Sequence, residues 1–395
     1  GNGIADDGFD ITDNGLTTAF AASATLALDA ITPLGGGNGA LSAGPAFLLG
    51  GVAADHSVSY NEVGSLQIRA AVNGYLGAAD ADIQGISPVI GRFYPAELVL
   101  AIGSGVTGSC NDMTYMDQPA LAVDFTLEAR NTAGIRTQHY DQTLFGGAGD
   151  LSAVGVHAVN NGEGVDRGSR LSGLLGSWNA GQYDVSVVNA TFARAVAPDG
   201  PLDALQLSVS ANDPLSDGWS LTGSSGSPAS VAVGSPTRLR YGRLAAENAY
   251  GPETQSLPQP LKVEYFDSAR GIFLVSEQDD CTEVNVVNMN GSPYVGTPVS
   301  LNGGAGDTTP SFTVSDSSGN GFVVTNGQAE LIYSAPGAGN TGAVLLEVDL
   351  GSLPWLQFDW DDDGAADFSM RPATATFGRY RGNDRMLFWQ ENFSR

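Results

Sequence analysis

The chain has 395 residues and a formal net charge of −26, which comes from 43 acidic and 17 basic residues. At about 150 residues per domain, this length corresponds to two or three domains. Lys262 is the only lysine. Such an excess of acid excludes nucleic acid and anionic membrane surfaces as partners, because no basic patch can offset the repulsion.

Glycine and apolar residues place the chain among folded proteins with many turns. Glycine contributes 53 residues, and 42% of the chain is hydrophobic. No apolar stretch reaches the roughly 18 residues that a membrane-spanning helix needs, so we expect no membrane insertion. The sequence starts at Gly1 without a charged leader, and we expect any signal peptide to have been removed or left out.

Short β-branched and aromatic runs bounded by turn residues follow one another along the chain. The clearest are Ser57 to Tyr60, Leu66 to Val72, Leu121 to Arg130, Tyr183 to Val188, Leu205 to Val209, Leu261 to Phe266, Gly321 to Thr325 and Ala343 to Asp349. Within Leu121 to Arg130, every second residue is apolar, which is typical of a strand with one buried face. The sequence therefore predicts an all-β fold of tandem antiparallel, Ig-like β-sandwich domains with Gly/Asn/Asp-rich turns.

Two breaks in composition divide the chain into three predicted domains. A proline-bounded segment, residues 88–95, ends a first β-sandwich domain at residues 1–95. The Gly/Ser/Pro-rich stretch from Thr222 to Pro236 is typical of a linker, and it ends a second β-sandwich domain at residues 96–235. Residues 236–395 then form a C-terminal β-sandwich domain that carries an acidic loop.

Three short segments place an arginine between a glycine and a large apolar residue. They are Gly91-Arg92-Phe93, Gly242-Arg243-Leu244 and Gly378-Arg379-Tyr380. We interpret each as a strand start at which the arginine stem packs on the sheet.

The acidic loop near the C-terminus has the spacing of a calcium-binding loop. Asp359, Asp361 and Asp363 occupy positions 1, 3 and 5, Gly364 occupies position 6, the main-chain carbonyl of Ala365 is at position 7, and Asp367 is at position 9. Five aspartates within nine residues repel one another unless a cation is bound. Position 12 is Met370 rather than glutamate, which excludes an EF-hand. The sequence predicts a helix-free calcium site, and a solvated acidic turn is the alternative.

Few residues support catalysis. His56, His139 and His157 are the only histidines, and the chain has no G-x-S-x-G nucleophile motif. Alternation in the segment around His139 predicts that this residue lies on the surface of a strand. We therefore expect no enzyme, with a carbohydrate-active enzyme that uses two carboxylates as the less favoured alternative.

The two cysteines, Cys110 and Cys281, do not form a C-x-x-C motif, which argues against a zinc or redox site. In an oxidising compartment they could pair, but sequence alone does not give their separation in space. The sequence is compatible with a disulfide and with two free thiols.

Most of the chain resembles a known family, closely after about Arg238 and more loosely before it. The residues that carry the resemblance are Trp355-Leu356, the acidic segment from Asp359 to Gly364, the segment from Ala375 to Arg385, and Trp389-Gln390-Glu391. Further matches lie at Tyr241 to Leu244, Glu247 to Gly251 and Asp279 to Thr282, and upstream at Met113 to Met116 and Ala129 to Asn131. This pattern is similar to the C-terminal region of MshQ-like proteins, which are associated with biogenesis of the mannose-sensitive haemagglutinin pilus, a type IV pilus.

The resemblance implies a secreted protein of the cell surface or pilus of a Gram-negative bacterium, with an undefined biochemical role. We expect it to act in adhesion or pilus assembly, stabilised by calcium. Its expected partners are other pilus or surface proteins, further copies of itself, or a glycan. A structural subunit that polymerises into an extracellular filament is the alternative.

Overall fold

The computed structural model describes residues 18–35, 39–49, 52–53, 57–74, 83–101, 103, 105–145, 151–212, 230–286, 294–301, 304–312, 321–361, 363–366 and 370–378. In these ranges the regular structure is strand, apart from short 3₁₀ helices such as η2 (Gly168–Arg170) and η4 (Pro354–Leu356). The predicted all-β fold is confirmed. No helix in the described part is long and apolar enough to cross a membrane.

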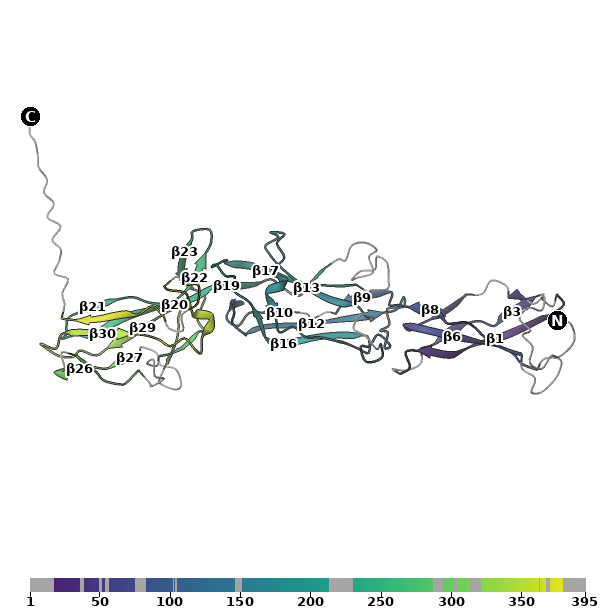
Figure 1. The fold of residues 1–395 in the computed structure, drawn as a ribbon, viewed down its shortest axis with the longest axis horizontal. Helices are drawn as coiled ribbons and strands as arrows, with labels where there is room; N and C mark the ends of the chain where they lie inside the picture. Colours follow the sequence, from purple (N-terminus) through teal and green to yellow (C-terminus); the bar gives the residue numbers. More distant parts are fainter. Residues whose placement is uncertain are drawn as a thin grey trace, which may run out of the picture.

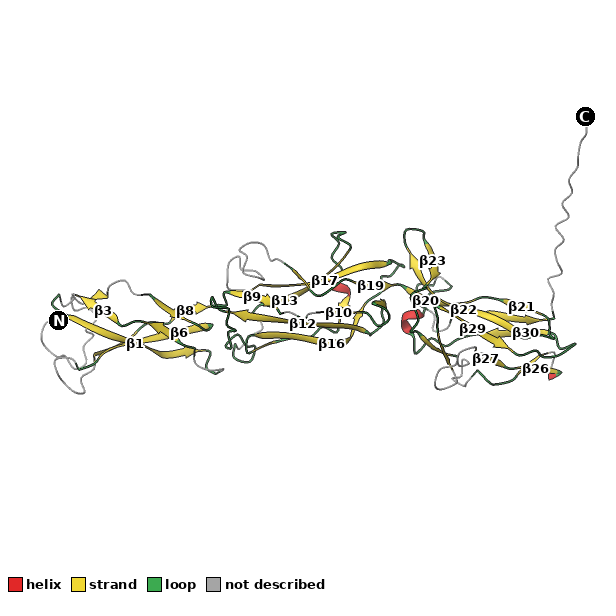
Figure 2. Ribbon diagram, turned by 180° about the vertical axis from the view of Figure 1, so that it is seen from behind, coloured by secondary structure: helices red, strands yellow, loops and turns green. Residues whose placement is uncertain are grey.

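Three β units follow one another along the long axis of the molecule (Figure 1). We call them the N-terminal unit (residues 21–93), the middle unit (97–240) and the C-terminal unit (242–378). The view from behind shows the same end-to-end arrangement (Figure 2). The predicted boundary at residue 95 falls between the last strand of the first unit and the first strand of the second.

The N-terminal unit has the smallest core. Its strands are β1 (Ala21–Thr32), β2 (Leu41–Ala43), β3 (Ala46–Leu49), β4 (Val52–Ala53), β5 (Val58–Tyr60), β6 (Gly64–Val72), β7 (Ile83–Ile86) and β8 (Ile90–Phe93). The main sheet has the order β4-β3-β1-β6-β7, and β8 also pairs with β6. Ala24, Ala46 and Val72 form its buried cluster. Small side chains bury little apolar area, so this unit has the weakest hydrophobic stabilisation of the three.

The middle unit is a sandwich of two sheets. Its strands are β9 (Glu97–Leu100), β10 (Gly105–Thr107), β11 (Met113–Tyr115), β12 (Leu121–Arg130), β13 (Ala153–Asn160), β14 (Leu171–Ser172), β15 (Trp178–Asn179), β16 (Gln182–Phe192), β17 (Leu202–Asn212), β18 (Val231–Ala232) and β19 (Thr237–Arg240). One sheet has the order β10-β12-β16-β14, with β9 and β15 attached, and the other has the order β11-β19-β17-β13, with β18 attached.

Strand β12 shows why the sequence forms this sandwich. Val123, Phe125, Leu127 and Ala129 are at most 1% exposed and lie in the middle core, whereas Asp124, between the first two, is exposed. Alternate residues of a strand point to opposite faces. The alternation read from the sequence therefore gives the correct buried face of this strand.

The C-terminal unit contains the largest core. Its strands are β20 (Gly242–Ala246), β21 (Ala249–Gly251), β22 (Leu257–Asp267), β23 (Ile272–Val275), β24 (Glu283–Asn285), β25 (Val299–Leu301), β26 (Gly306–Thr308), β27 (Pro310–Phe312), β28 (Gly321–Val323), β29 (Gln328–Tyr333), β30 (Gly342–Leu346) and β31 (Ala373–Phe377). The main sheet has the order β20-β22-β29-β27, with β23 attached to β22. A second sheet has the order β21-β31-β30, and the pairs β24-β28 and β25-β26 are separate.

Two strand pairs differ from the predicted antiparallel pattern. β11 pairs with β19 in parallel, and β21 pairs with β31 in parallel. Parallel partners require a long connection, and in both pairs most of a unit separates the two strands in sequence. The other named pairs in the described residues are antiparallel, as predicted.

The middle and C-terminal units pack directly against each other and are not separated by a free linker. Residues 213–229, which include most of the predicted linker, lie outside the described residues. Beyond them, β18 and β19 both pair with β17, so the sheet of the middle unit continues to Arg240, past the predicted boundary at 235. Met113 and Tyr115 of β11 lie in the core of the C-terminal unit. The two units therefore share buried surface.

Candidate functional site

The acidic loop gathers three of the predicted metal-binding carboxylates. Asp359, Asp361 and Asp363 each offer one carboxylate oxygen, and these oxygens lie within 4.8 Å of one another. Asp359 is half-buried, while Asp361 and Asp363 are exposed. Ala365 lies in the same exposed turn, and Asp367 is outside the described residues. Carboxylate oxygens at this spacing match the ligand type that a hard cation such as Ca²⁺ prefers.

Main-chain amides hold these carboxylates in a tight turn. The Gly364 amide donates to Asp359 Oδ2 at 2.8 Å, and the Asp363 amide donates to Asp359 Oδ1 at 3.1 Å. The Ala365 amide donates to Asp363 Oδ1 at 2.8 Å. Gly364 has a φ of +91°, a conformation that favours glycine. The glycine at loop position 6 therefore has the turn-forming role that the spacing predicts.

An arginine stack holds this loop on the C-terminal unit. The Arg243 guanidinium carbon lies 3.7 Å from the ring centroid of Phe273, 4.7 Å from that of Trp360 and 5.2 Å from that of Phe358. Arg243 Nη2 also pairs with Glu264 Oε2 at 2.7 Å. The attraction between a planar guanidinium and the faces of aromatic rings stabilises this arrangement. Because Phe358 and Trp360 flank Asp359 in sequence, the stack fixes the start of the acidic loop.

Arg194 joins the middle unit to the segment that leads into this loop. Its guanidinium donates to the main-chain carbonyls of Gln357 at 2.6 Å and Gly242 at 2.7 Å, and also to that of Trp355. It lies 4.4 Å from the ring centroid of Tyr241, and its side chain is 9% exposed. Desolvation lowers the pKa of Arg194, although the group stays cationic. A buried charge of this kind is stable only while its acceptors remain in place.

A disulfide joins the same two units covalently. Cys110, next to β11, is bonded to Cys281 of the C-terminal unit, with 5.8 Å between their Cα atoms. Of the two alternatives that the sequence left open, pairing is therefore the one the structure contains. The bond closes a separation of 171 residues, which corresponds to about 5 kcal/mol in the chain-entropy model.

Asp279 lies beside the disulfide and is fully buried. Its Oδ2 accepts from Tyr115 Oη at 2.8 Å and from Thr282 Oγ1 at 2.6 Å, and its Oδ1 accepts from the Cys281 amide at 3.1 Å. Burial, followed by the Asp279 charge, raises the pKa of Tyr115 well above its usual value, so the phenol stays a donor. We call the set of disulfide, Asp279, Arg194 and their partners the fused junction.

The junction between the N-terminal and middle units is polar by comparison. Glu62 Oε1 accepts from the Gln138 amide at 2.8 Å, and its Oε2 accepts from the His139 amide at 3.1 Å. The Arg92 guanidinium lies 4.7 Å from the ring centroid of Phe145. We call this set the polar junction.

His139 corrects one sequence prediction. It lies in a turn and is fully buried, whereas alternation predicts a surface strand position. The alternation rule applies to strands, and this segment is not one.

The arginine–glycine pattern is partly explained by these contacts. Arg243 lies near the start of β20 as interpreted, whereas Arg92 lies near the end of β8, and the guanidinium groups of both lie over aromatic rings. Arg379 lies outside the described residues. Arg194 belongs to no such pattern, and no signal in the sequence connects it with carbonyl groups of another unit.

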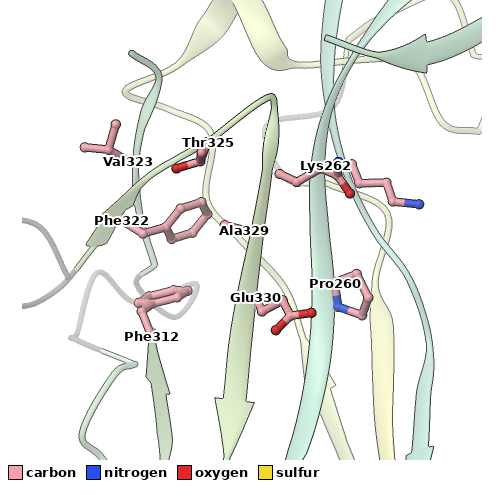
Figure 3. Close-up of a pocket in the computed structure, with 9 residues that line it drawn as sticks. Pro260, Lys262, Phe312, Phe322, Val323, Thr325, Ala329 and Glu330 are labelled. Carbon is pink, nitrogen blue, oxygen red and sulfur yellow. The ribbon is translucent and has the colours of Figure 1, made fainter. Parts of the chain in front are cut away.

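A cavity of about 500 Å³ lies in the C-terminal unit, lined by residues of β22, β27, β28 and β29. The rings of Phe312 and Phe322 lie 4.5 Å apart between centroids. Figure 3 shows them on one side of β29, with Pro260 and Lys262 on the β22 side. Glu330, Gln328 and Thr325 supply polar groups. Aromatic faces beside hydrogen-bonding groups suit a small ligand with apolar and polar faces.

The tryptophans do not form a shared carbohydrate platform in the described residues. Trp178 is 2% exposed and lies in the middle core, and Trp355 packs against the core of the C-terminal unit. Trp360 belongs to the Arg243 stack, while Trp219 and Trp389 lie outside the described residues.

Comparison with known families classifies the chain. Residues 240–392 match the model of the fourth domain of DUF6701, and residues 62–233 match the model of its third domain. The chain belongs to the DUF6701 family. No curated protein matches it.

Solved structures similar to this DUF6701 chain include three bacterial proteins. FdeC, a broadly conserved Escherichia coli adhesin, is 12% identical, with a TM-score of 0.33 and coverage of 86% of this chain and 83% of FdeC. The Yersinia pseudotuberculosis adhesin InvE is 14% identical, with a TM-score of 0.22 and coverage of 71% and 58%. Invasin, a bacterial integrin-binding protein, is 11% identical, with a TM-score of 0.28 and coverage of 82% and 56%.

Proposed function

We propose that this DUF6701 chain acts in adhesion as an extended protein outside a Gram-negative cell, where it holds a binding surface away from its anchor. The observation that carries the proposal is the fused junction. Two β units joined by a disulfide and by the buried Arg194 move as one body, which suits a protein that spans distance. The polar junction would let the N-terminal unit change its angle to that body.

Two further features support a location outside the cell. Disulfides such as Cys110–Cys281 persist in oxidising compartments and are rare in the cytosol. The net charge of −26 favours solubility in saline surroundings. The resemblance to MshQ-like proteins supports the finer proposal that its partners are type IV pilus or surface proteins.

In-frame deletion of these residues from the gene tests the adhesion role. Attachment of the source bacterium to host cells should fall sharply and should return when the segment is restored. A control strain that carries Glu163→Ala, an exposed substitution within the middle unit, should attach normally. Unchanged attachment after deletion, with the remaining protein still on the surface, would contradict the proposal.

Calcium at the acidic loop is part of the proposal. Asp359, Asp361 and Asp363 fit a hard cation by their donor type and spacing, and Asp367 and the Ala365 carbonyl are the further proposed ligands. A bound cation would cancel repulsion among the carboxylates. It would thereby stabilise the segment that Arg194 and Arg243 hold.

A thermal melt tests the calcium part. Free calcium at about 100 times its dissociation constant should add about 2.7 kcal/mol, which is a shift of a few degrees. EDTA should reverse the shift, and Asp361→Asn should reduce it. The control Asp124→Asn, an exposed aspartate on β12, should retain it. No shift in the unaltered protein would remove calcium from the proposal and leave the adhesion role untouched.

The cavity in the C-terminal unit favours a glycan as the bound ligand. Phe312, which is half-buried, would contact the apolar face of a sugar ring, while the exposed Glu330 and Gln328 would accept and donate hydrogen bonds. A glycan array with the whole chain should give binding that Glu330→Gln weakens. The matched change Glu347→Gln, at a residue outside the cavity, should leave it unchanged. Absence of binding on the array would exclude a glycan as the ligand of this cavity.

An edge strand favours the second candidate function, a filament subunit. β7 ends its sheet, its four residues are exposed, and Ile83 and Ile86 are 44% and 53% exposed. Exposed apolar edges accept strands from other chains. Electron microscopy of concentrated protein should show filaments if this role holds. Ile86→Lys should abolish such filaments.

A further inference from the structure

Three polar side chains on the outer face of the middle unit form a connected chain. His157 lies on β13, Ser210 lies on β17, and Asp166 follows β13 in sequence. His157 Nδ1 lies 2.6 Å from Asp166 Oδ2, and His157 Nε2 lies 2.8 Å from Ser210 Oγ. Both distances are within hydrogen-bond range.

Asp166 is held in place by the main chain. Its Oδ1 accepts from the Gly168 amide at 2.8 Å and from the Ala158 amide at 3.0 Å, so Oδ2 remains directed at His157. Desolvation opposes ionisation of this carboxyl, but the hydrogen bonds from Ala158, His157 and Gly168 outweigh it and lower the pKa of Asp166 to about 2. The carboxylate is therefore ionised at neutral pH and can only accept hydrogen bonds.

The ionised carboxylate sets the direction of the other hydrogen bond. Because Asp166 can only accept, His157 Nδ1 must carry the proton, and Nε2 of the neutral ring is then an acceptor. With the ring neutral, Ser210 donates its hydroxyl proton to Nε2. This is the order of a nucleophile, a general base and an orienting carboxylate, which is recognised by geometry and not by sequence position.

Two glycines leave the room that this arrangement needs. A Cβ on Gly155, which pairs with Ser210, would lie 2.8 Å from Ser210 Oγ. A Cβ on Gly168 would lie 3.0 Å from the His157 Cα and 3.1 Å from Asp166 Oδ1. A side chain at Gly155 would displace Ser210, and one at Gly168 would meet first the Val156 carbonyl oxygen, 2.2 Å away, and then His157 and Asp166. The side chains of His157 and Asp166 are 37% and 48% exposed, so reagents reach the face from solvent.

We propose that Ser210, His157 and Asp166 form a nucleophilic site that cleaves carboxylic esters, in addition to the adhesion role. Ser210 and His157 are the catalytic residues, and Asp166 is a positioning residue. This departs from the expectation of a non-enzymatic protein. The open face suits an ester carried on a large or extended molecule, because His157 and Asp166 are reached directly from solvent.

The reaction follows from the hydrogen bonds. Ser210 Oγ forms a bond to the acyl carbon as its proton passes to His157 Nε2. The bond from the acyl carbon to the alcohol oxygen breaks, and the leaving oxygen takes that proton. Water then attacks the acyl-serine and gives its proton to His157. The carboxylic acid leaves, and the proton returns to Ser210.

Labelling of the full chain with a fluorophosphonate, read by peptide mass, tests the proposal. One adduct should appear on Ser210 of the folded protein, and none on the Ser210→Ala variant. His157→Gln should slow labelling by about 100-fold or more, because it removes the general base. Asp166→Asn should slow it too, because an amide no longer fixes the protonated nitrogen.

Ser208→Ala is the matched control. Ser208 lies directly opposite His157 in the register of β13 and β17, and labelling of this variant should equal that of the unaltered protein. The rates at which the unaltered protein and its variants hydrolyse 4-nitrophenyl acetate should rank in the same order as their labelling rates. Circular dichroism melts of all variants verify that they are folded. Absence of an adduct on Ser210, or equal labelling of the unaltered protein and folded His157→Gln, would overturn the proposal.

Discussion

The fused junction and the polar junction differ in what crosses them. At the polar junction the amides of Gln138 and His139 donate to Glu62, and Asn131 donates to the Asn61 carbonyl. The Arg92 guanidinium lies over the Phe145 ring, and Val63 is the one residue of the N-terminal unit in the buried cluster of the middle unit. The fused junction adds a covalent bond and a buried cation on three carbonyls, and it shares more core residues. A hydrogen bond that is exposed to water stabilises the folded state by only about 1 kcal/mol, because water competes for its donor and acceptor. Water does not compete in this way for a disulfide or for the hydrogen bonds of a buried charge. One chain thus contains a junction held by non-covalent contacts and a junction closed by a disulfide.

Removal of the disulfide should have the largest effect on this contrast. The double variant Cys110→Ser, Cys281→Ser should lose up to about 5 kcal/mol in free energy of unfolding, and the C-terminal unit should unfold apart from the middle unit. Calorimetry of the variant, beside reduced unaltered protein as a control, measures this. Equal melting of the oxidised and reduced forms would show that the disulfide does not stabilise the junction.

Arg194→Met should come next. The change keeps the apolar stem but leaves buried carbonyls of Gln357 and Gly242 without a donor, at a cost of about 3 kcal/mol in total. Urea unfolding gives the value. The control Arg167→Met removes an arginine paired with the exposed Glu163 and should cost less than about 1 kcal/mol. If both variants lose the same free energy of unfolding, the burial of Arg194 does not account for its contribution to stability.

Glu62→Ala should loosen the polar junction without affecting the fused one. The two amide hydrogen bonds that cross the junction are lost, worth about 1–2 kcal/mol together. Small-angle X-ray scattering should show a wider range of molecular dimensions, while melting of the middle and C-terminal units stays unchanged. Glu163→Ala, at a carboxylate bonded only within the middle unit, should leave the scattering unchanged. Unchanged scattering of the Glu62→Ala variant would mean that other contacts fix the angle between the N-terminal and middle units.

Phe145→Leu should have the smallest effect. It keeps an apolar side chain but removes the ring under Arg92, for a loss of about 0.5–1 kcal/mol. Hydrogen exchange at β8 should increase modestly. Exchange at β20, beside the fused junction, should not change, and an equal increase there would mean that the two junctions are not independent.

Local patterns in the sequence predicted the features that depend on neighbouring residues. Alternation gave the buried face of β12, because Val123 and Phe125 must point the same way in any strand. The spacing of Asp359, Asp361 and Gly364 gave a turn that gathers carboxylates, because adjacent amides cap them. The same reasoning was wrong for His139, where strand alternation was applied to a turn.

The sequence by itself determined an acidic, all-β chain with an aspartate loop, because composition, two-residue periodicity and turn spacing are local properties. Only the tertiary structure decided that Cys110 meets Cys281, that Arg194 reaches Gln357, and that Ser210 lies beside His157. These contacts join residues far apart in the chain. Their distances follow from how the sheets pair and pack, which no local pattern specifies.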